Sequence, residues 1–378
     1  MRVALDFTSG AWQIAGIGRA TRGLVGGLIE LDTPDLELKP FYAGGRPSAT
    51  ARLMFVGTRY RVRRLPLPER VILALWHKLR APLPIELVAG AVDLVHSPDF
   101  VLPPARCRRA VVTVHDLTYV THPETAHPAQ KRYLDRVVPR SVERATRVIA
   151  VSGATRDDLV REYGVAPERV DVVHNGLDAN FARRPTGAQR QEARVRFGLP
   201  ERFVLGVGTI QPRKNLVRTA RAVAVARARG HDIHFVHVGA AGWLSEGVFA
   251  GLEELDDRFV HRLGPVDDRW LPALYSEAEI TLAVSLAEGF MLPIIESMAM
   301  GTPVITSRAS CMPEIAGEAA ELVDPLDVAE IGEAIARVLD DQDLAERLTR
   351  AGEVRAGVFS WADSATATHA IYQQVAEV

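Results

Sequence analysis

The stretch EITLAVSLAEGFMLPIIESMAMGTPVITS, residues 279–307, contains the strand–helix–strand unit from which the fold is predicted. Two short runs rich in strand-forming residues, 279–285 and 302–307, flank a segment that begins near Pro293 and ends before Gly301. Proline is tolerated in the first helical turn and glycine is common just beyond the last, so we expect a helix over 293–300. A strand, a helix and a second strand in this order are typical of a parallel sheet.

The same alternation continues through the rest of the chain in two series, separated by a polar segment at 179–200. Two series predict an α/β protein with two Rossmann-like, doubly wound parallel-sheet domains. We expect a first domain over 1–178, a linker over 179–200, a second domain over 201–359, and a final helix over 360–378 that can pack back on the first domain. The expected strands are 2–7, 93–97, 110–115, 147–152 and 170–175, then 203–208, 233–239, 258–264, 279–285 and 302–307.

The composition is that of an ordinary globular protein, with 47% hydrophobic and 24% charged residues in 378. No apolar run approaches the roughly 20 residues that span a bilayer, and the first residues predict a strand, not a signal peptide. We therefore expect a cytoplasmic protein, or one at the inner face of the membrane. Cys107 and Cys311 lie far apart and fit no metal-binding spacing, so neither a structural disulfide nor a metal site is expected.

The net charge of −2 hides an asymmetry between the two halves. Residues 1–178 contain 25 Lys and Arg against 19 Asp and Glu, whereas residues 179–378 contain 20 against 28. Part of the basic excess lies in RYRVRRLPLPERVILALWHKLR, residues 59–80, where Glu69 is the only acid. This stretch can contact an anionic membrane surface or an anionic acceptor, or it can simply be a solvated face. No motif for nucleic-acid binding is present, so nucleic acid is not expected as a partner.

Ligands of open parallel sheets bind beyond the carboxyl ends of the strands. One such loop contains Arg213 and Lys214, followed by Asn215, which we expect to cap the next helix. Cations are disfavoured at a helix start, and two of them there favour a phosphate or diphosphate site. A second loop contains Glu288 and leads into a helix with Glu296 in its expected first turn. A favourable fit to the helix dipole explains Glu296 alone, but paired carboxylate oxygens also suit the vicinal hydroxyls of a sugar.

The amino-terminal half offers two further candidates. The loop at 8–28 is rich in glycine but lacks the spacing of dinucleotide binders, so NAD is not expected, although its backbone N–H groups and Arg19 can approach a phosphate. His115 and Asp116 follow a strand, at a position that suits either a site or a structural role. Ser152 is most simply a helix cap. No serine-histidine-aspartate order, metal cluster or P-loop is apparent.

Taken together, these residues resemble the retaining GT-B glycosyltransferases of the large bacterial family 4 type, which has a Glu-x7-Glu motif and includes α-mannosyl- and α-glucosyltransferases. The resemblance covers nearly the whole chain. It is strongest where GTIQPRKNL, LPALYSEAEI, EGFMLPIIESMAMGTPVITS and PEIAGEAAELVDPLD follow in the family's order. GIGRATRGL and VTVHDLTYVTHPE resemble members acting in O-antigen and other surface-polysaccharide assembly, many of them mannosyltransferases. The resemblance implies two domains that face each other across a cleft.

The resemblance also implies roles for individual residues. Arg213 and Lys214 match the residues that bind the donor's diphosphate. Glu288 matches the contact to the donor sugar, Glu296 the contact to the ribose hydroxyls, and His115 the contact near the sugar's 6-hydroxyl. The implied catalytic residues are His115, Arg213, Lys214 and Glu288. The implied donor-binding residues are Gly16, Gly18, Gly208, Arg213, Lys214, Glu288, Gly289, Phe290, Met291, Leu292 and Glu296.

Two positions depart from the family pattern, which commonly has glycine in place of Met291 and proline in place of Val284. The implied activity is transfer of a hexose, first mannose from GDP-mannose, to a glycan or lipid-linked acceptor in polysaccharide biosynthesis, with retention and without a metal or other cofactor. UDP-glucose and a dTDP-deoxysugar stay open as donors. The alternatives are a GT-B-like nucleotide-sugar epimerase or hydrolase and a non-catalytic nucleotide-sugar-binding protein.

Overall fold

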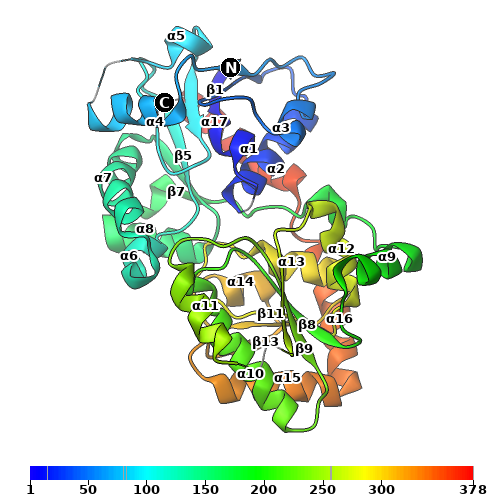
Figure 1. Cartoon of the computed structure of the whole chain (residues 1–378). Coiled ribbons are helices and arrows are strands. Elements are labelled where there is room, and N and C mark those ends of the chain that lie inside the picture. The colour runs from blue at the N-terminus through cyan, green and yellow to red at the C-terminus, as the bar shows by residue number, and fades with distance from the viewer. Residues whose placement is uncertain (15, 80, 82, 256–257, 378) are drawn as a thin grey trace. The chain divides into compact units, whose positions relative to one another are not determined.

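The structure is a computed structural model that describes residues 1–14, 16–79, 81, 83–255 and 258–377. The chain divides into two compact units, each built around one parallel sheet (Figure 1). The amino-terminal unit comprises Met1–Val120, Pro128–Gly176 and Ser360–Val378. The carboxyl-terminal unit comprises Thr121–His127 and Leu177–Phe359.

The sheet of the amino-terminal unit has seven parallel strands in the order β3-β2-β1-β4-β5-β6-β7. Residues alternate between its two faces, so that Val3 and Leu5 pack in one apolar cluster, whereas Ala4 and Val95 pack in another. Both faces are therefore covered, as expected of a parallel sheet. The strands are β1 (Arg2–Asp6), β2 (Glu37–Tyr42), β3 (Arg63–Arg64), β4 (Leu94–Ser97), β5 (Ala110–Val114), β6 (Arg147–Ala150) and β7 (Val170–Val172).

The sheet of the carboxyl-terminal unit has six parallel strands in the order β10-β9-β8-β11-β12-β13. Val204 and Ile305 belong to the apolar cluster under α10 and α15, whereas Phe203 and Leu205 belong to the cluster that contains Tyr275 of α12. The strands are β8 (Phe203–Val207), β9 (His234–Val238), β10 (Val260–Gly264), β11 (Ile280–Ala283), β12 (Val304–Ser307) and β13 (Glu321–Val323). Every predicted strand overlaps an observed one, and the doubly wound α/β prediction is confirmed.

The helices cover the faces of the two sheets (Figure 1). The helix predicted over 293–300 is α13, which begins and ends one residue earlier. The helices are α1 (Thr8–Trp12), α2 (Ile17–Glu30), α3 (Ala49–Leu53), α4 (Glu69–Leu73), α5 (Glu86–Ala89), α6 (Thr118–Thr121), α7 (Pro128–Arg144), α8 (Gly153–Tyr163), α9 (Gly187–Phe197), α10 (Leu216–Ala228), α11 (Ser245–Glu253), α12 (Leu271–Glu277), α13 (Leu292–Ala299), α14 (Met312–Ala316), α15 (Val328–Asp340), α16 (Gln342–Ala356) and α17 (Trp361–Glu377).

The last helix, α17, belongs to the amino-terminal unit and packs along α2 (Figure 1). Close approach of the two helices depends on Gly27, where an added Cβ would lie only 3.0 Å from the Cβ of Ala365. Tyr372 of α17 is fully buried, and its hydroxyl lies 2.5 Å from Nδ1 of His96 on β4. The final helix thus supplies part of the core of the unit that begins the chain.

The segment 179–200, predicted as a linker, instead forms part of the carboxyl-terminal unit. Its helix α9 begins with a capping box between Thr186 and Gln189, and Ala193 is fully buried. Arg194 forms an ion pair with Glu277 of α12 at 2.7 Å. The polar composition of this segment therefore reflects a helix with one narrow buried face, not a free connection.

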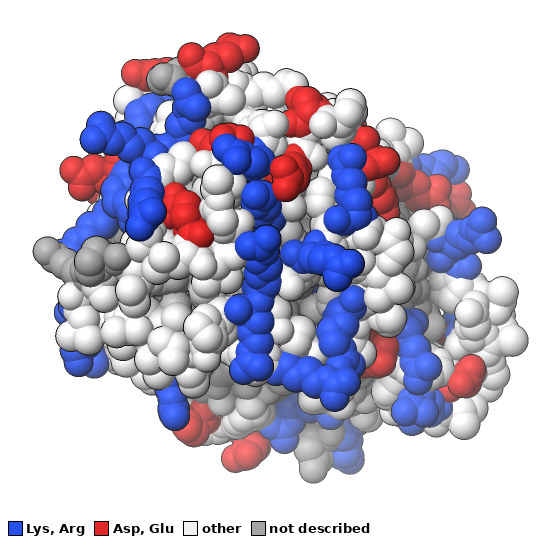
Figure 2. Space-filling view, turned by 90° about the horizontal axis from the view of Figure 1, so that it is seen from above, with Lys and Arg blue, Asp and Glu red and all other residues white. Residues whose placement is uncertain are grey.

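The basic stretch 59–80 is not one amphipathic helix, because it is divided among β3, α4 and a π-helical turn at Ala74–Lys78. Arg80 lies outside the described residues. The described cations of the stretch are exposed, whereas Ile72 and Trp76 are buried in the unit's own core. Figure 2 shows a face of the molecule on which Lys and Arg side chains gather. Within the part of the chain that the structure describes, no helix has the length and apolar content needed to cross a bilayer.

Candidate functional site

The loop after β8 brings the two predicted phosphate-binding cations to the carboxyl edge of the sheet. A single 3-10 turn, Pro212–Lys214, contains both, and Asn215 then adopts a left-handed conformation with φ of 59°. Asn215 occupies the N-cap position of α10, as predicted, but its side chain makes no capping hydrogen bond. Its amide instead donates to the carbonyl oxygens of Val284 at 3.1 Å and Pro325 at 2.7 Å. Asn215 therefore ties the cationic loop to the loop that follows β11.

The loop after β11 carries Glu288 and is held on both sides by hydrogen bonds. The backbone N–H of Leu286 donates to the carbonyl of Arg213 at 2.9 Å, and the hydroxyl of Ser310 donates to the carbonyl of Glu288 at 2.6 Å. Three residues of these loops have positive φ angles, which residues other than glycine rarely adopt: Asn215, Met291 and Ser310. Backbone strain of this kind concentrates at functional sites.

Glu288 forms ion pairs with both cations of the neighbouring loop. One carboxylate oxygen pairs with Arg213, and the other lies 2.7 Å from Nζ of Lys214. The three side chains are only 9–14% exposed. Burial by itself raises the pKa of Glu288, but the charges and hydrogen bonds of Arg213 and Lys214 outweigh it and hold that pKa at about 2. The site therefore contains a carboxylate that stays ionised at any working pH.

Neighbouring residues fix the path of Lys214. Gly208 has φ of 147°, and a Cβ at this position would lie 3.0 Å from Cε of Lys214. On the other side, the sulfur of Met291 lies 3.6 Å from Nζ of Lys214. Met291 has φ of 70° and is 6% exposed, so this chain keeps a glycine-like backbone conformation while adding a buried thioether beside the cation.

The remaining predicted donor-binding residues of this loop, Gly289, Phe290 and Leu292, follow Glu288 directly. Gly289 is buried, and the ring of Phe290 packs edge-on against Phe359 with centroids 5.5 Å apart. Leu292 is the first residue of α13 and is partly buried. These residues therefore anchor the loop within the unit and present its backbone, not large polar side chains, at the sheet edge.

Glu296 lies one residue further along α13 than predicted. The helix begins at Leu292, so Glu296 is its fifth residue and lies beyond the first turn, where it is 1% exposed. The hydroxyl of Tyr275 donates to one oxygen of its carboxylate at 2.8 Å. A simple fit to the helix dipole therefore does not account for this buried carboxylate, which Tyr275 holds in one orientation.

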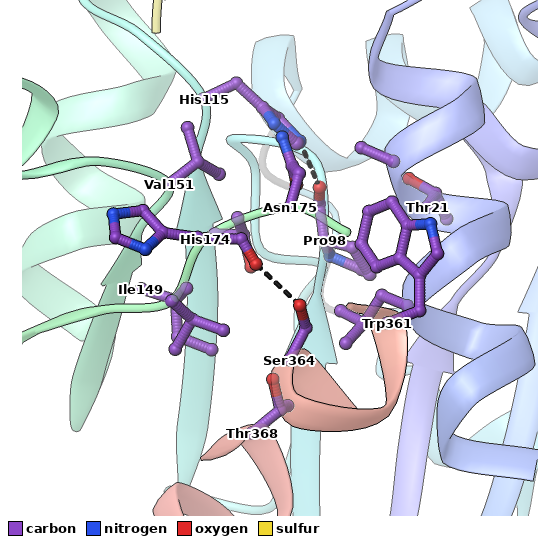
Figure 3. A pocket seen from close by; sticks show the side chains of 14 residues that line it. Thr21, Pro98, His115, Ile149, Val151, His174, Asn175, Trp361, Ser364 and Thr368 are labelled. Carbon is purple, nitrogen blue, oxygen red and sulfur yellow. Dashed lines mark hydrogen bonds between the residues drawn. The ribbon is translucent and has the colours of Figure 1, made fainter. Parts of the chain in front are cut away.

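His115 lies in the amino-terminal unit, at the end of β5, and is 8% exposed. Its Nε2 lies 2.7 Å from the carbonyl oxygen of Pro98 (Figure 3), so Nε2 must carry the hydrogen and Nδ1 is left as an acceptor. Burial lowers the pKa of His115, although the Pro98 hydrogen bond and Asp116 act in the opposite direction. At neutral pH the ring is thus an uncharged hydrogen-bond acceptor.

The cavity beside His115 is too small for a sugar. It has a volume of about 20 Å³ and is closed on one side by Trp361, Ser364 and Thr368 of α17 (Figure 3). A space of this size has room for about one water molecule. This cavity therefore cannot hold the sugar that His115 is predicted to contact.

Gly16 and Gly18 stand at the start of α2 in the amino-terminal unit. Gly16 precedes the helix with φ of 43° and is exposed. A Cβ at Gly18 would lie 2.7 Å from the carbonyl carbon of Gln13, so only glycine fits there. The guanidinium of Arg22 donates to the carbonyl of Gln13 at 2.6 Å and closes the loop. These features are consistent with a shaped loop, and its role toward phosphates stays a prediction.

Sequence reasoning missed two residues of the carboxyl-terminal unit. One is Ser310, which holds the backbone of Glu288 by a hydrogen bond. The other is His237, which is buried near the end of β9. The rule that ligand loops follow strand ends could have found both, because each lies at or just beyond the carboxyl end of a predicted strand. Across the described residues, no group of three or more His, Cys, Asp or Glu side chains is arranged to hold a metal.

Comparisons with known proteins agree with the geometry in both units. A family model described as Glycosyl transferases group 1 matches residues 201–341, and one described as Glycosyltransferase Family 4 matches residues 16–181. The O-antigen chain mannosyltransferase B of Escherichia coli is 30% identical over 284 residues, which are 74% of this chain and 74% of that protein. The MMP alpha-(1->4)-mannosyltransferase of Mycolicibacterium hassiacum is 34% identical over 240 residues, 62% of this chain and 56% of that protein.

Solved structures share the fold at lower identity. Anabaena Alr3699/HepE, solved with UDP and glucose, superposes with a TM-score of 0.76 at 19% identity, over 99% of this chain and 100% of that chain. The sucrose-phosphate synthase of Thermosynechococcus elongatus gives 0.74 at 22% identity, over 99% of each chain. The predicted resemblance is confirmed, and this chain belongs to the GT-B-fold glycosyltransferases of the family 4 type.

Proposed function

We propose that the protein transfers a hexose from a nucleoside diphosphate sugar to a hydroxyl of a glycan or lipid-linked glycan in polysaccharide assembly. The observation that carries this proposal is the meeting of Arg213, Lys214 and Glu288 at the carboxyl edge of one parallel sheet. Two cations beside an anionic hydrogen-bond acceptor match a ligand that joins a diphosphate to a polyhydroxylated ring. The E. coli relative named for O-antigen chain mannosyl transfer supports the acceptor class.

The proposed mechanism depends on stabilising the diphosphate as it leaves. Arg213 and Lys214 neutralise the charge that develops on it, and the amino terminus of α13 adds the favourable end of its dipole. Glu288 accepts hydrogen bonds from sugar hydroxyls, and Glu296 accepts them from the ribose. His115, with Nδ1 as an acceptor, receives a hydrogen bond from a hydroxyl of the donor sugar.

We propose GDP-mannose as the donor, because two mannosyltransferases are among the similar proteins. The Anabaena structure with UDP and glucose makes UDP-glucose the main competitor. A thermal-shift panel of GDP-mannose, UDP-glucose and a dTDP-deoxysugar tests this choice, since stabilisation rises with the logarithm of concentration over dissociation constant. The largest shift with GDP-mannose supports the proposal, and a larger shift with either competitor overturns it.

We propose retention at the anomeric carbon and activity without a metal. The anomeric configuration of the product, measured by proton NMR on a purified oligosaccharide, tests the first part. Turnover in excess chelator tests the second, because Arg213 and Lys214 supply the positive charge that a divalent cation would otherwise supply. An inverted product or complete loss of turnover in chelator would contradict the respective part.

Incubation with donor alone separates transfer from the alternatives. A transferase releases nucleoside diphosphate rapidly only when an acceptor is present, whereas an epimerase or hydrolase consumes or converts the donor without one. A non-catalytic binding protein would show a thermal shift but no turnover with any acceptor. Acceptor-dependent release of nucleoside diphosphate therefore supports transfer against both.

We also propose that the amino-terminal unit contacts an anionic membrane surface on which a lipid-linked acceptor is carried. Exposed cations such as Arg61 lie near in sequence to unusually exposed apolar side chains, with Leu53 at 68% and Val56 at 72%. Co-sedimentation with vesicles containing anionic lipid, compared with purely zwitterionic vesicles, tests the contact. Equal binding to both, or to neither, would contradict it.

A further inference from the structure

The two cations assigned to the diphosphate have an anionic partner within the protein itself. Glu288 pairs with Arg213 through one oxygen and with Lys214 at 2.7 Å through the other. We infer, on the basis of the proposed function, that Glu288 is an internal counter-ion that the donor's diphosphate displaces and that returns when the nucleoside diphosphate leaves. Glu288 would then influence binding and release of the diphosphate, in addition to contacting the sugar.

The charge balance among the protein's own side chains gives the first reason. The side chains of Arg213 and Lys214 are only 11% and 14% exposed, so water can solvate them only in part. Two like charges held together and partly desolvated repel each other unless an anion lies between them. Glu288 supplies that anion and reduces the net charge of the three groups from two positive charges to one.

Charge balance in the occupied site gives the second reason. A diphosphate brings at least two negative charges to the same cations, and an ionised Glu288 left in place would repel it. The Glu288 side chain must therefore turn away from the cations as the diphosphate arrives. The hydroxyls of the attached sugar offer hydrogen-bond donors, so the carboxylate exchanges ammonium and guanidinium partners for hydroxyl partners.

The surrounding contacts restrict this exchange to a side-chain rotation. The carbonyl of Glu288 accepts a hydrogen bond from Ser310 at 2.6 Å, and the backbone of Leu286 is bonded to that of Arg213 at 2.9 Å. The two loops are thus joined while the carboxylate moves. The Met291 sulfur, 3.6 Å from Nζ of Lys214, is only a weak acceptor and cannot replace Glu288 as a counter-ion.

The variant Glu288→Gln tests the inference, because it keeps the shape of the side chain and removes its charge. The probes are inorganic pyrophosphate, GDP and UDP, titrated into the full chain by calorimetry. We expect Glu288→Gln to bind pyrophosphate roughly tenfold tighter or more than wild type, since a close charge shifts such equilibria by about one to three powers of ten. Its affinity should also fall more steeply with salt, because two net positive charges then attract the ligand.

The variant that binds pyrophosphate more tightly should turn over more slowly. Glu288→Gln should release nucleoside diphosphate more slowly and show stronger inhibition by added nucleoside diphosphate than wild type. A merely structural role for Glu288 would weaken binding and turnover together. Pyrophosphate binding by Glu288→Gln that is unchanged or weaker than wild type overturns the inference.

Glu277→Gln is the matched control. Glu277 is 13% exposed and pairs with Arg194 at 2.7 Å and Arg190 at 3.4 Å, in the same unit but outside the candidate site. It should leave pyrophosphate affinity unchanged, and equal tightening in this variant would also overturn the inference. Should Glu288→Gln fail to fold, as judged by circular dichroism and thermal unfolding, Glu288→Asp replaces it. The shorter carboxylate reaches the cations less well and should give an intermediate gain in affinity, whereas no gain counts against the inference.

The two proposals fail in different ways. If wild type binds neither pyrophosphate nor any nucleoside diphosphate, the proposed function is wrong and the inference with it. If wild type binds them and Glu288→Gln binds them no tighter, only the counter-ion role is wrong.

Discussion

In the amino-terminal unit, β5 is followed directly by His115, a buried imidazole that is uncharged at neutral pH. The carboxyl-terminal unit instead gathers Arg213, Lys214 and Glu288 in the loops after β8 and β11, where the three side chains form ion pairs. Both units use the same doubly wound architecture, so the fold alone does not determine the electrostatics of its strand ends. A variant that removes a charge in one unit and a variant that removes a neutral acceptor in the other should therefore differ in how much activity they lose and in how that loss depends on pH.

The largest effect is expected for Lys214→Ala. Loss of one cation that stabilises a departing diphosphate should lower turnover by about 10²–10³-fold. The folded state should persist, because Arg213 still pairs with Glu288. Release of nucleoside diphosphate at saturating donor measures the effect. The control is Arg221→Ala, which removes an exposed cation paired with Glu254 at 3.2 Å in the same unit. Near-wild-type turnover of Lys214→Ala would refute the role of this cation.

The next effect concerns stability and pH, with one histidine in each unit. Burial lowers the pKa of both His96 and His237 to about 3, with smaller contributions from His115 and Lys214 respectively. A histidine in the unfolded chain takes up a proton near pH 6.5, whereas these two histidines in the folded protein do so only near pH 3. Stability is therefore full above pH 6.5 and falls below it, by about 1.4 kcal/mol per pH unit for each histidine.

Chemical unfolding at pH 7.0 and 5.5 measures this slope, and His96→Gln and His237→Gln should each make it less steep. The contribution of Glu288 lies in another pH range, because its lowered pKa makes its stabilisation disappear only as pH falls below 4.5 toward about 2. A stability that is flat between pH 7.0 and 5.5 would mean that neither histidine is buried as a neutral ring.

A smaller effect is expected for His115→Gln. Loss of one neutral hydrogen bond to the donor should lower kcat/KM by about tenfold. In wild type, kcat/KM should stay constant at neutral pH and fall only below pH 6.5, because protonation of Nδ1 turns the acceptor into a donor and the pKa is lowered. The variant should lack this acid limb. A loss as large as that of Lys214→Ala would show that the imidazole does more than accept one hydrogen bond.

The smallest effect on stability is expected for Met291→Gly. Relief of a left-handed backbone is worth about 1–2 kcal/mol, and loss of a buried methionine side chain costs a similar amount. The free energy of unfolding should thus change by about 1 kcal/mol or less, whereas Met291→Val should be clearly less stable because a branched residue tolerates φ of 70° poorly. The ratio of kcat/KM for GDP-mannose and UDP-glucose should shift by about tenfold in Met291→Gly. An unchanged ratio would remove Met291 from donor selection.

Much of the fold can be predicted from the sequence, because strand-like runs and helix ends leave local signals. The strands that the sequence does not reveal have weak signals: β2 contains Pro40, β3 has two residues and β13 has three. In the segment 179–200, the capping box of Thr186 and Gln189 is a visible helix signal that polar composition obscures.

The residues of the candidate site can be predicted from the same rule about strand ends, but their contacts cannot. The ion pairs of Glu288 depend on two loops about 75 residues apart in the chain, and no local pattern encodes their register. Asn215 illustrates the same limit, because its side-chain amide donates to the distant carbonyls of Val284 and Pro325 and not to the helix that it precedes. Local patterns thus predict which chemical groups a loop carries, but not which residues of other loops these groups contact.

The place of α17 has a consequence for how the chain is made. Ala365, Ile371, Tyr372 and Val375 are buried in the same cluster as Val3 and Leu5 of the first strand. During synthesis, the amino-terminal sheet emerges from the ribosome first, yet its core is incomplete until residue 375 has been added. The unit translated second can therefore finish folding before the unit translated first. Chains interrupted late in translation would expose apolar surface on their oldest part, where proteases and chaperones can recognise them.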